Sequence, residues 1–176
     1  MKLALLADIH ANLEALHAVL AALENTAADE IWCLGDIVGY GADPGPCLEL
    51  IREKCAVVVA GNHDTSSANL AQIESYNPYA QQALRWTHDR LDEAGRNWLA
   101  GLPLRVVRAG CVVFHGSLSR RNDYIDGETI ARLNLELLRA QYADCLLALH
   151  GHTHVKSIAS EDGGFLPFAT ARTITL

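Results

Sequence analysis

Short apolar runs alternate with stretches of helical periodicity along most of the chain. Each apolar run spans four or five residues, which is the length of a strand buried in a sheet. The predicted strands cover residues 3–7, 31–34, 56–60, 104–107, 111–114 and 145–149. Between them, apolar residues recur every three or four positions, and we expect helices over residues 12–23, 45–54, 66–100 and 127–141. This alternation indicates a layered α/β fold.

Local signals support several element boundaries. Asn12 is a suitable N-cap for the first helix, and prolines start the second. Gly110 and its neighbours predict a hairpin between the fourth and fifth strands. The tail is predicted to be β at residues 155–160 and 172–176, with a turn at Gly163 and Gly164.

The length of 176 residues suits one domain, and 50% apolar residues are enough to build its core. We find no internal repeat, linker or low-complexity segment. The sequence therefore predicts a single domain over residues 1–176, within which the helical segment 65–103 covers the sheet like a cap.

Charge and cysteine content restrict the partners. The net charge is -7, whereas nucleic-acid binders usually carry a basic excess, so neither stable nucleic-acid binding nor a membrane surface is expected. Five cysteines without CxxC spacing do not indicate a zinc site or a disulfide framework. The first apolar run stops at Asp8, too early for a signal peptide or a membrane span. We expect a cytoplasmic protein. The sequence does not determine the oligomeric state, and a homo-oligomer is one of the open alternatives.

Polar residues follow five of the predicted strands at the point where each strand ends. They are Asp8, His10, Asp36, Asn62, His63, Asp64, His115, His150, His152 and His154. Because ligands of open α/β sheets bind beyond the carboxyl ends of the strands, we expect these side chains to share one rim.

The residue types and their spacing favour a metal site at this rim. Asp8 and His10 are two residues apart, as are His152 and His154, so in extended segments each pair would point the same way. Carboxylate, imidazole and amide donors together suit Mn, Fe, Zn, Ni or Co. Taken alone, Asp8 could equally cap a helix and Asp36 could serve its glycine-rich turn.

Five short motifs occur in order: DIH at 8–10, GDIVG at 35–39, GNHD at 61–64, HG at 115–116 and GHTH at 151–154. Together they resemble the calcineurin-like metallophosphoesterases, in particular the small bacterial and archaeal phosphodiesterase-like members. The resemblance spans roughly residues 1–155. It implies a two-sheet αββα sandwich with the metal site at the carboxyl ends of the strands. The family's Pro-Gly-Ser turn after GHxH has no counterpart here, so the far edge of the sandwich is not implied.

The resemblance also implies a role for each residue of the rim. Asp8, His10 and His154 would hold one metal ion, Asn62, His115 and His152 would hold the other, and Asp36 would bridge them. His63 would stay off the metals and donate a proton to the leaving group, oriented by Asp64. Alternation alone does not tell which of the last three histidines bind, and the family pattern leaves out His150.

The implied reaction is hydrolysis of a phosphate ester, foremost a phosphodiester, by a hydroxide that bridges two divalent ions. Such ions lower the pKa of water from about 15.7 toward about 7 and clamp the phosphoryl oxygens. Manganese is the expected ion. Two alternatives stay open: a dinucleoside polyphosphate hydrolase or phosphomonoesterase, and a non-catalytic metal-binding scaffold. A complete motif set that includes His63 favours an enzyme over a scaffold.

The substrate is expected to be a small phosphate ester, with a nucleotide among the candidates. The candidate substrate contacts are Asn62, His63 and Arg120. Arg121 could touch a substrate phosphate as well, and for both arginines a solvated loop position is the favoured interpretation. Three aromatic side chains are open to either a base pocket or ordinary packing: Tyr40, Tyr76 and Trp86.

Overall fold

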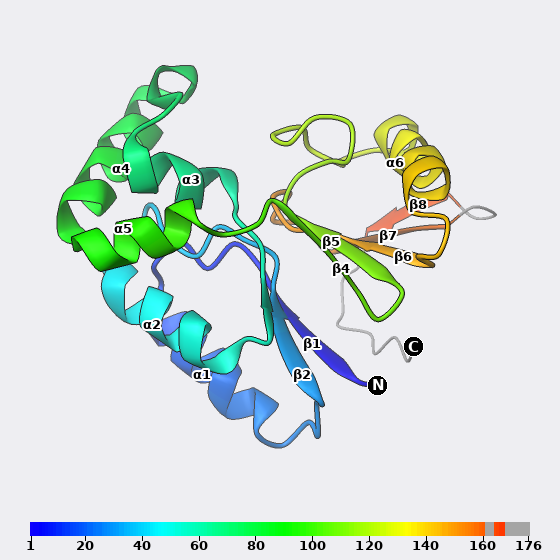
Figure 1. Ribbon diagram of the computed structural model, residues 1–176, viewed down its shortest axis with the longest axis horizontal. Coiled ribbons are helices and arrows are strands. Elements are labelled where there is room, and N and C mark those ends of the chain that lie inside the picture. The colour runs from blue at the N-terminus through cyan, green and yellow to red at the C-terminus, as the bar shows by residue number, and fades with distance from the viewer. Residues whose placement is uncertain (161–163, 168–176) are drawn as a thin grey trace.

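Two three-stranded sheets form the centre of the computed structural model, which describes residues 1–160 and 164–167 (Figure 1). The first sheet is parallel, in the order β1 (Leu3–Leu6), β2 (Glu30–Cys33), β3 (Val57–Val58). The second sheet contains β4 (Arg105–Arg108), β5 (Cys111–Phe114) and β6 (Leu147–Leu149). In it β4 and β5 are antiparallel and β5 and β6 are parallel. The strands β7 (Ser157–Ser160) and β8 (Gly164–Pro167) form an antiparallel pair.

Helices cover both outer faces of these sheets. Those that follow the strands of the first sheet are α1 (Leu13–Leu23), α2 (Pro44–Lys54), α3 (Asn62–Asn69), α4 (Pro78–Arg90) and α5 (Glu93–Ala100). A single 3₁₀ turn, Ile73–Ser75, lies between α3 and α4. Figure 1 shows α1 to α5 gathered on one side and α6 (Glu128–Gln141) on the other.

Three apolar clusters join these layers. One includes Leu16 of α1 and Ile51 of α2, which pack against Leu6 and Cys33 of the first sheet. A second lies between the sheets and includes the fully buried Trp32. Burying such a side chain contributes about 1.5–3 kcal/mol. The third packs the second sheet against α6. The order of helix, sheet, sheet and helix confirms the predicted αββα sandwich.

The stretch 66–100, predicted to be helical, contains three α-helices, the first of which begins at Asn62, and a 3₁₀ turn between the first two. The chain breaks before Pro78, which cannot continue a preceding helix, and the Asn77 side chain caps α4 by accepting from Ala80 N at 3.0 Å. Asp92 caps α5 in the same way, accepting from Gly95 N at 2.7 Å. The apolar periodicity correctly predicts helical structure here, but the capping residues divide the stretch into separate helices.

Other predictions differ at element ends. Asn12 caps α1 as predicted, accepting from Ala15 N at 3.0 Å. The third strand is shorter than predicted because Ala60 N leaves the ladder and donates to Pro103 O at 2.8 Å. The predicted strand 172–176 and Gly163 lie outside the described residues. Within the described ranges, no helix is both long and apolar enough to cross a membrane.

Candidate metal centre

The loops after β1, β2, β5 and β6 bring six possible metal ligands together. An outer cluster consists of Asp8, His10 and His154, and an inner cluster of Asp36, His115 and His152. Within each cluster, one ligand atom of every residue lies within 4.8 Å of the others. Asp36 Oδ2 lies 3.2 Å from His115 Nε2 and 3.7 Å from His10 Nε2, so its carboxylate stands between the clusters. The shared rim expected from the sequence is present.

Left-handed backbone, not extended backbone, aims these side chains. Five of the seven predicted ligands have a positive φ: Asp8 (55°), His10 (50°), Asp36 (54°), His152 (71°) and His154 (54°). The expectation that residues two apart point the same way in an extended segment is therefore wrong for both pairs. Non-glycine residues in this region cost of order 1–3 kcal/mol each and tend to cluster at functional sites.

Glycines make room for this arrangement. A Cβ at Gly39, whose φ is 93°, would lie 2.5 Å from Nδ1 of His63. A Cβ at Gly61 would collide with the Asp36 carboxylate. The glycines of the second and third motifs thus allow two loops to approach the same carboxylate and imidazole.

Backbone carbonyls fix one ring nitrogen of three histidines. Nδ1 of His10 lies 3.2 Å from Val38 O, and Nδ1 of His115 lies 2.8 Å from Leu34 O. His152 uses its other nitrogen, Nε2, which lies 3.1 Å from Asn122 O. A ring nitrogen that donates to a carbonyl leaves the opposite nitrogen as a lone-pair donor, which is the usual arrangement around metal-binding histidines.

Several lone pairs of the site have no hydrogen-bond partner. The buried Asn62 Oδ1 and His115 Nε2 atoms lack one among the described residues. Asn62 Nδ2 donates to Tyr76 Oη at 3.0 Å, which fixes the amide with its oxygen free. In the outer cluster, Nε2 of His10 faces Nε2 of His154 at 3.2 Å. Buried acceptors without donors are costly, and divalent cations would satisfy them, so the residues fit metal ions.

Charge coupling between the central carboxylate and its imidazole is strong. Burial raises the pKa of Asp36, but the nearby positive charge of His115 outweighs burial and holds that pKa at about 2. Burial lowers the pKa of His115, but Asp36 and then the Leu34 carbonyl raise it to about 9. In the protein without ions, His115 is therefore an imidazolium beside the Asp36 carboxylate at pH 7, and its Nε2 would offer a lone pair to an ion only after losing that proton.

His63 lies beside the clusters in an aromatic setting. Its ring centroid is 4.8 Å from that of His10, 4.5 Å from that of Tyr40 and 5.4 Å from that of Tyr76. Burial lowers the pKa of His63 to about 4, so the ring is neutral at pH 7. His63 also comes within 4.8 Å of Asp36 and His10, so its place off the metals rests on the family resemblance.

Asp64 does not orient His63, contrary to the prediction. Its Oδ1 accepts from Ile37 N at 2.8 Å and Val38 N at 3.1 Å, and its Oδ2 accepts from Gly61 N at 2.9 Å. His63 Nδ1 has no partner among the described residues. The difference arises because the buried carboxylate satisfies backbone amides of two loops. Asp64 thus holds the loop after β2 against the turn after β3.

The arrangement of motifs and ligands agrees with a family comparison. The model of the calcineurin-like phosphoesterases matches residues 1–156. The chain belongs to the calcineurin-like phosphoesterase family. The predicted family is thereby confirmed, and membership makes a metal-dependent site the expected use of this rim.

This chain covers between about half and two thirds of the length of three similar proteins. A protein of Methanocaldococcus jannaschii is 33% identical, over 93% of this chain and 67% of its own. The crystal structure of a metallophosphoesterase from Sphaerobacter thermophilus has a TM-score of 0.75 and 38% identity, covering 89% of this chain and 62% of that one. A symmetrical bis(5'-nucleosyl)-tetraphosphatase of Actinobacillus pleuropneumoniae is 29% identical over 83% of this chain. The chain spans only 56% of that enzyme.

A cavity of about 490 Å³ lies over the inner and outer ligand clusters of this phosphoesterase family member. Tyr40, Tyr76 and Tyr124 line it together with His63 and Asn62. Two of the open aromatic positions, Tyr40 and Tyr76, thus face the site. Trp86 does not line it and instead carries the Arg90 guanidinium over its ring at 5.5 Å.

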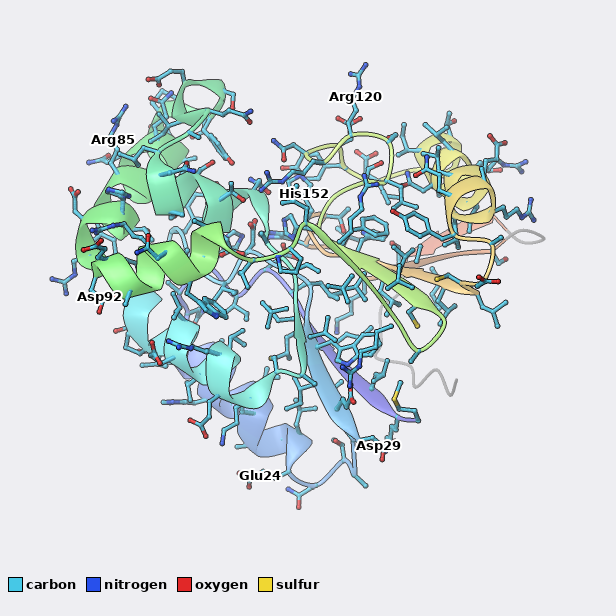
Figure 2. All side chains as sticks on the ribbon, viewed as in Figure 1. Glu24, Asp29, Arg85, Asp92, Arg120 and His152 are labelled. Atoms are coloured by element: carbon cyan, nitrogen blue, oxygen red, sulfur yellow. The ribbon has the colours of Figure 1, made fainter. Side chains whose placement is uncertain are left out.

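The predicted substrate contact of Arg120 is not supported. Arg120 is exposed, does not line the cavity, and points outward from the loop after β5, away from His152 (Figure 2). Its neighbour Arg121 turns inward and donates to Gly61 O at 3.1 Å. Sequence reasoning also missed Tyr124, whose ring stacks on His152 at 4.1 Å. No spacing signal distinguishes Arg121 from Arg120, because both lie in an irregular loop.

Proposed function

We propose that this protein hydrolyses a phosphate ester, with a phosphodiester as the expected substrate, at two divalent metal ions held by the inner and outer clusters. The observation that carries the proposal is Asp36, whose carboxylate lies 3.2 Å from His115 and 3.7 Å from His10. A single buried carboxylate between two sets of imidazoles is the arrangement that a pair of bridged cations requires.

Each ion would have its own set of side chains. The outer ion would be bound by Asp8, His10 and His154, the inner ion by Asn62, His115 and His152, and both by Asp36. The mixed oxygen and nitrogen donors support manganese as the ion, with Fe, Zn, Ni and Co as alternatives. Bound there, two divalent ions supply charge that activates water and neutralises the phosphoryl oxygens.

The local charge favours an anionic substrate despite the net charge of -7. Two divalent ions would bring about four positive charges, and Asp8 and Asp36 would remove two of them. Surface carboxylates beyond a Debye length of about 8 Å are largely screened. A phosphate group would therefore meet a positive centre at the base of the cavity.

His63 is proposed to serve the leaving group. Its ring lines the cavity between Tyr40 and Tyr76, within reach of an ester bound at the clusters. The imidazole is neutral in the protein alone, and the negative charge of a bound phosphate would favour its protonated form. Asn62 would contact both an ion and the substrate.

A dinucleoside polyphosphate is the second candidate substrate. It is favoured by the similarity to symmetrical bis(5'-nucleosyl)-tetraphosphatases. That name describes the activity of the whole enzyme, of which this chain spans 56%. We further propose that residues 1–176 form one domain acting in the cytoplasm. Leu91 and Leu99 of the segment 65–103 pack into the main core cluster, and all five cysteines are free, as is usual in a reducing compartment.

The direct test is turnover of bis-p-nitrophenyl phosphate by the purified protein with Mn²⁺, with and without chelator. We expect metal-dependent hydrolysis and close to two ions per chain by elemental analysis. Bound metal without hydrolysis of any diester, monoester or dinucleoside polyphosphate would identify a scaffold. Absence of both metal and turnover would overturn the proposal.

Replacing the proposed acid separates chemistry from metal binding. His63→Ala should keep both ions but lose about 10²–10⁴-fold in kcat on an ester with a poor leaving group, because a positioned acid contributes about that much. The loss should be much smaller with p-nitrophenolate, which leaves without a proton. Equal losses on both substrates would contradict the acid role.

A further inference from the structure

Arg121 is a half-buried guanidinium with unused donors beside the candidate metal centre. Both of its hydrogen bonds come from one nitrogen, Nη2, which donates to Gly61 O and to Thr65 Oγ1. Its buried Nε has no partner among the described residues. A guanidinium carries five N–H donors, so most of the donor capacity of Arg121 is left over.

The Arg121 guanidinium also has no carboxylate in contact with it, and Asp36 and Asp64 act on its charge only from a greater distance. Among the described residues, no carboxylate forms an ion pair with it, whereas Arg108, Arg132 and Arg85 each have one. A charge that is partly removed from water normally has a partner, and a guanidinium matches carboxylate or phosphate oxygens with its planar fork. An anion is the expected partner.

The space in front of Arg121 has the right lining for such an anion. A recess of about 80 Å³ lies against its side chain, and it shares Asn62 and Tyr76 with the large cavity over the metal clusters. Hydroxyl and amide side chains line the rest of the recess, among them Thr65, Ser66 and Gln72, and no carboxylate does. The recess is thus a neutral-to-positive extension of the site.

The loop that carries Arg121 is held in place before any ligand binds. Asn134 of α6 is buried, and its Oδ1 accepts from Leu118 N at 2.7 Å and from Ser117 Oγ at 3.1 Å. On the other side of Arg121, Asn122 O contacts the His152 ring at 3.1 Å. A guanidinium fixed from both sides loses little freedom on binding, which favours affinity.

We propose that this recess binds a second phosphate group of the substrate, next to the one at the metal clusters. Resting on the proposed function, this inference favours, among its candidate substrates, compounds in which two or more phosphates are linked over a diester with a single phosphorus. Arg121 would recognise the non-reacting phosphate, and the hydroxyls and amides of the recess would donate to its remaining oxygens.

Binding of two inert phosphonates to the Mn²⁺-loaded protein tests the subsite without turnover. Methylenediphosphonate carries two linked phosphonates and methylphosphonate carries one, and neither is hydrolysed. Dissociation constants would be measured for both on the unaltered protein, Arg121→Gln, Arg121→Lys and Arg120→Gln. Arg120→Gln is the matched control, because this substitution of an exposed arginine removes the same charge from the same loop.

The unaltered protein should bind the diphosphonate at least about tenfold more tightly than the monophosphonate. Arg121→Gln should reduce that preference about tenfold or more, toward equal binding of the two phosphonates, as expected for charged hydrogen bonds, and Arg121→Lys should reduce it less. Arg120→Gln should leave it within about twofold. Chelation of Mn²⁺ by the diphosphonate affects all variants alike and cancels between them.

Equal binding of both phosphonates by the unaltered protein would overturn the subsite, even if bis-p-nitrophenyl phosphate is hydrolysed. A parallel loss of both affinities in Arg121→Gln, or an equal effect of Arg120→Gln, would reduce Arg121 to a structural or general electrostatic role. Preferential diphosphonate binding that depends on Arg121, without hydrolysis of any ester, would instead refute the proposed activity and leave the subsite standing. If Arg121→Gln does not fold, the unaltered protein and Arg121→Lys decide the question.

Discussion

The inner and outer clusters use the same kinds of side chain but differ in how firmly the fold holds them. In the inner cluster, Asp36, His115 and His152 are 1%, 2% and 7% exposed. In the outer cluster, the side chains of His10 and Asp8 are 11% and 12% exposed, and that of His154 is 57% exposed. The inner cluster is part of the core, whereas the last ligand of the outer cluster, His154, lies exposed to solvent.

The contacts behind the ligand atoms separate His154 from the other ligands. His10, His115 and His152 each place a ring nitrogen against a backbone carbonyl, Asp36 Oδ1 accepts from His63 N at 2.8 Å, and Asp8 Oδ1 accepts from His152 N at 2.9 Å. The ring of His154 has no backbone carbonyl in an equivalent place among the described residues, and faces His10 and Asp8 only. Folding therefore preorganises all ligands of the inner ion and two of the outer ion, and leaves His154 to be ordered by the outer ion.

The largest expected effect comes from the carboxylate that joins the two clusters. Asp36→Asn removes the charge between them but keeps an oxygen that can accept from His63 N. Both ion positions should weaken, and activity should fall by roughly 10³-fold or more, since several kcal/mol of charge stabilisation are lost. Elemental analysis after dialysis would check this. Full occupancy at either position in the variant would contradict a bridging role.

Single replacements in each cluster should sharpen the contrast in burial. His115→Ala leaves Leu34 O without its donor and opens buried space, so the ion-free protein should lose about 1–3 kcal/mol, or roughly 3–10 °C in Tm. His154→Ala removes an exposed ring and should shift that Tm by less than about 2 °C. Each variant should still lose one ion. Equal Tm losses would show that the clusters are equally integrated.

Proton release distinguishes the clusters by pH. The pKa of His115, raised to about 9 beside Asp36, means that the ion-free inner site carries a proton at pH 7. Its contribution to folding is complete below the unfolded value near 6.5 and is lost as pH rises through about 9. An inner ion must displace this proton, so its affinity should rise about tenfold per pH unit between these values.

Titration calorimetry in buffers of different ionisation enthalpy would measure that release. We expect about one proton per inner ion at pH 7, and no such release in the His115→Ala variant, which loses that ion. An affinity that is flat between pH 6.5 and 9 would mean that His115 is neutral before the ion binds.

The sequence was sufficient for the parts of this comparison that depend on periodicity and motif order. Apolar runs predicted the strands of both sheets, and the residues after them predicted which side chains meet at the rim. The caps at Asn77 and Asp92, which divide the long helical segment, are each recognisable only once the helix ends are known. The predicted element boundaries were therefore wrong where polar capping residues interrupt a continuous apolar periodicity.

What the sequence did not predict depends on the path of loops. Positive φ values at five ligands, the amide contacts of Asp64 and the inward turn of Arg121 follow from backbone closure between segments far apart in the chain. The two adjacent arginines show the limit most clearly, since identical side chains in one loop point in opposite senses. Charge and residue type alone did not tell which of the two turns inward.

The smallest expected effect tests whether packing, as well as hydrogen bonding, holds the inner cluster. Tyr124 stacks on His152 with ring centroids 4.1 Å apart and planes at 13°, yet it is 54% exposed. An aromatic pair contributes about 0.5–1.5 kcal/mol, so Tyr124→Ala should weaken the inner ion about two- to tenfold and leave the outer ion unchanged. Competition with a chromogenic chelator would resolve the two affinities. If the outer ion weakens instead, Tyr124 acts on the mouth of the cavity, and the orientation of His152 depends on the Asn122 carbonyl and not on the Tyr124 ring.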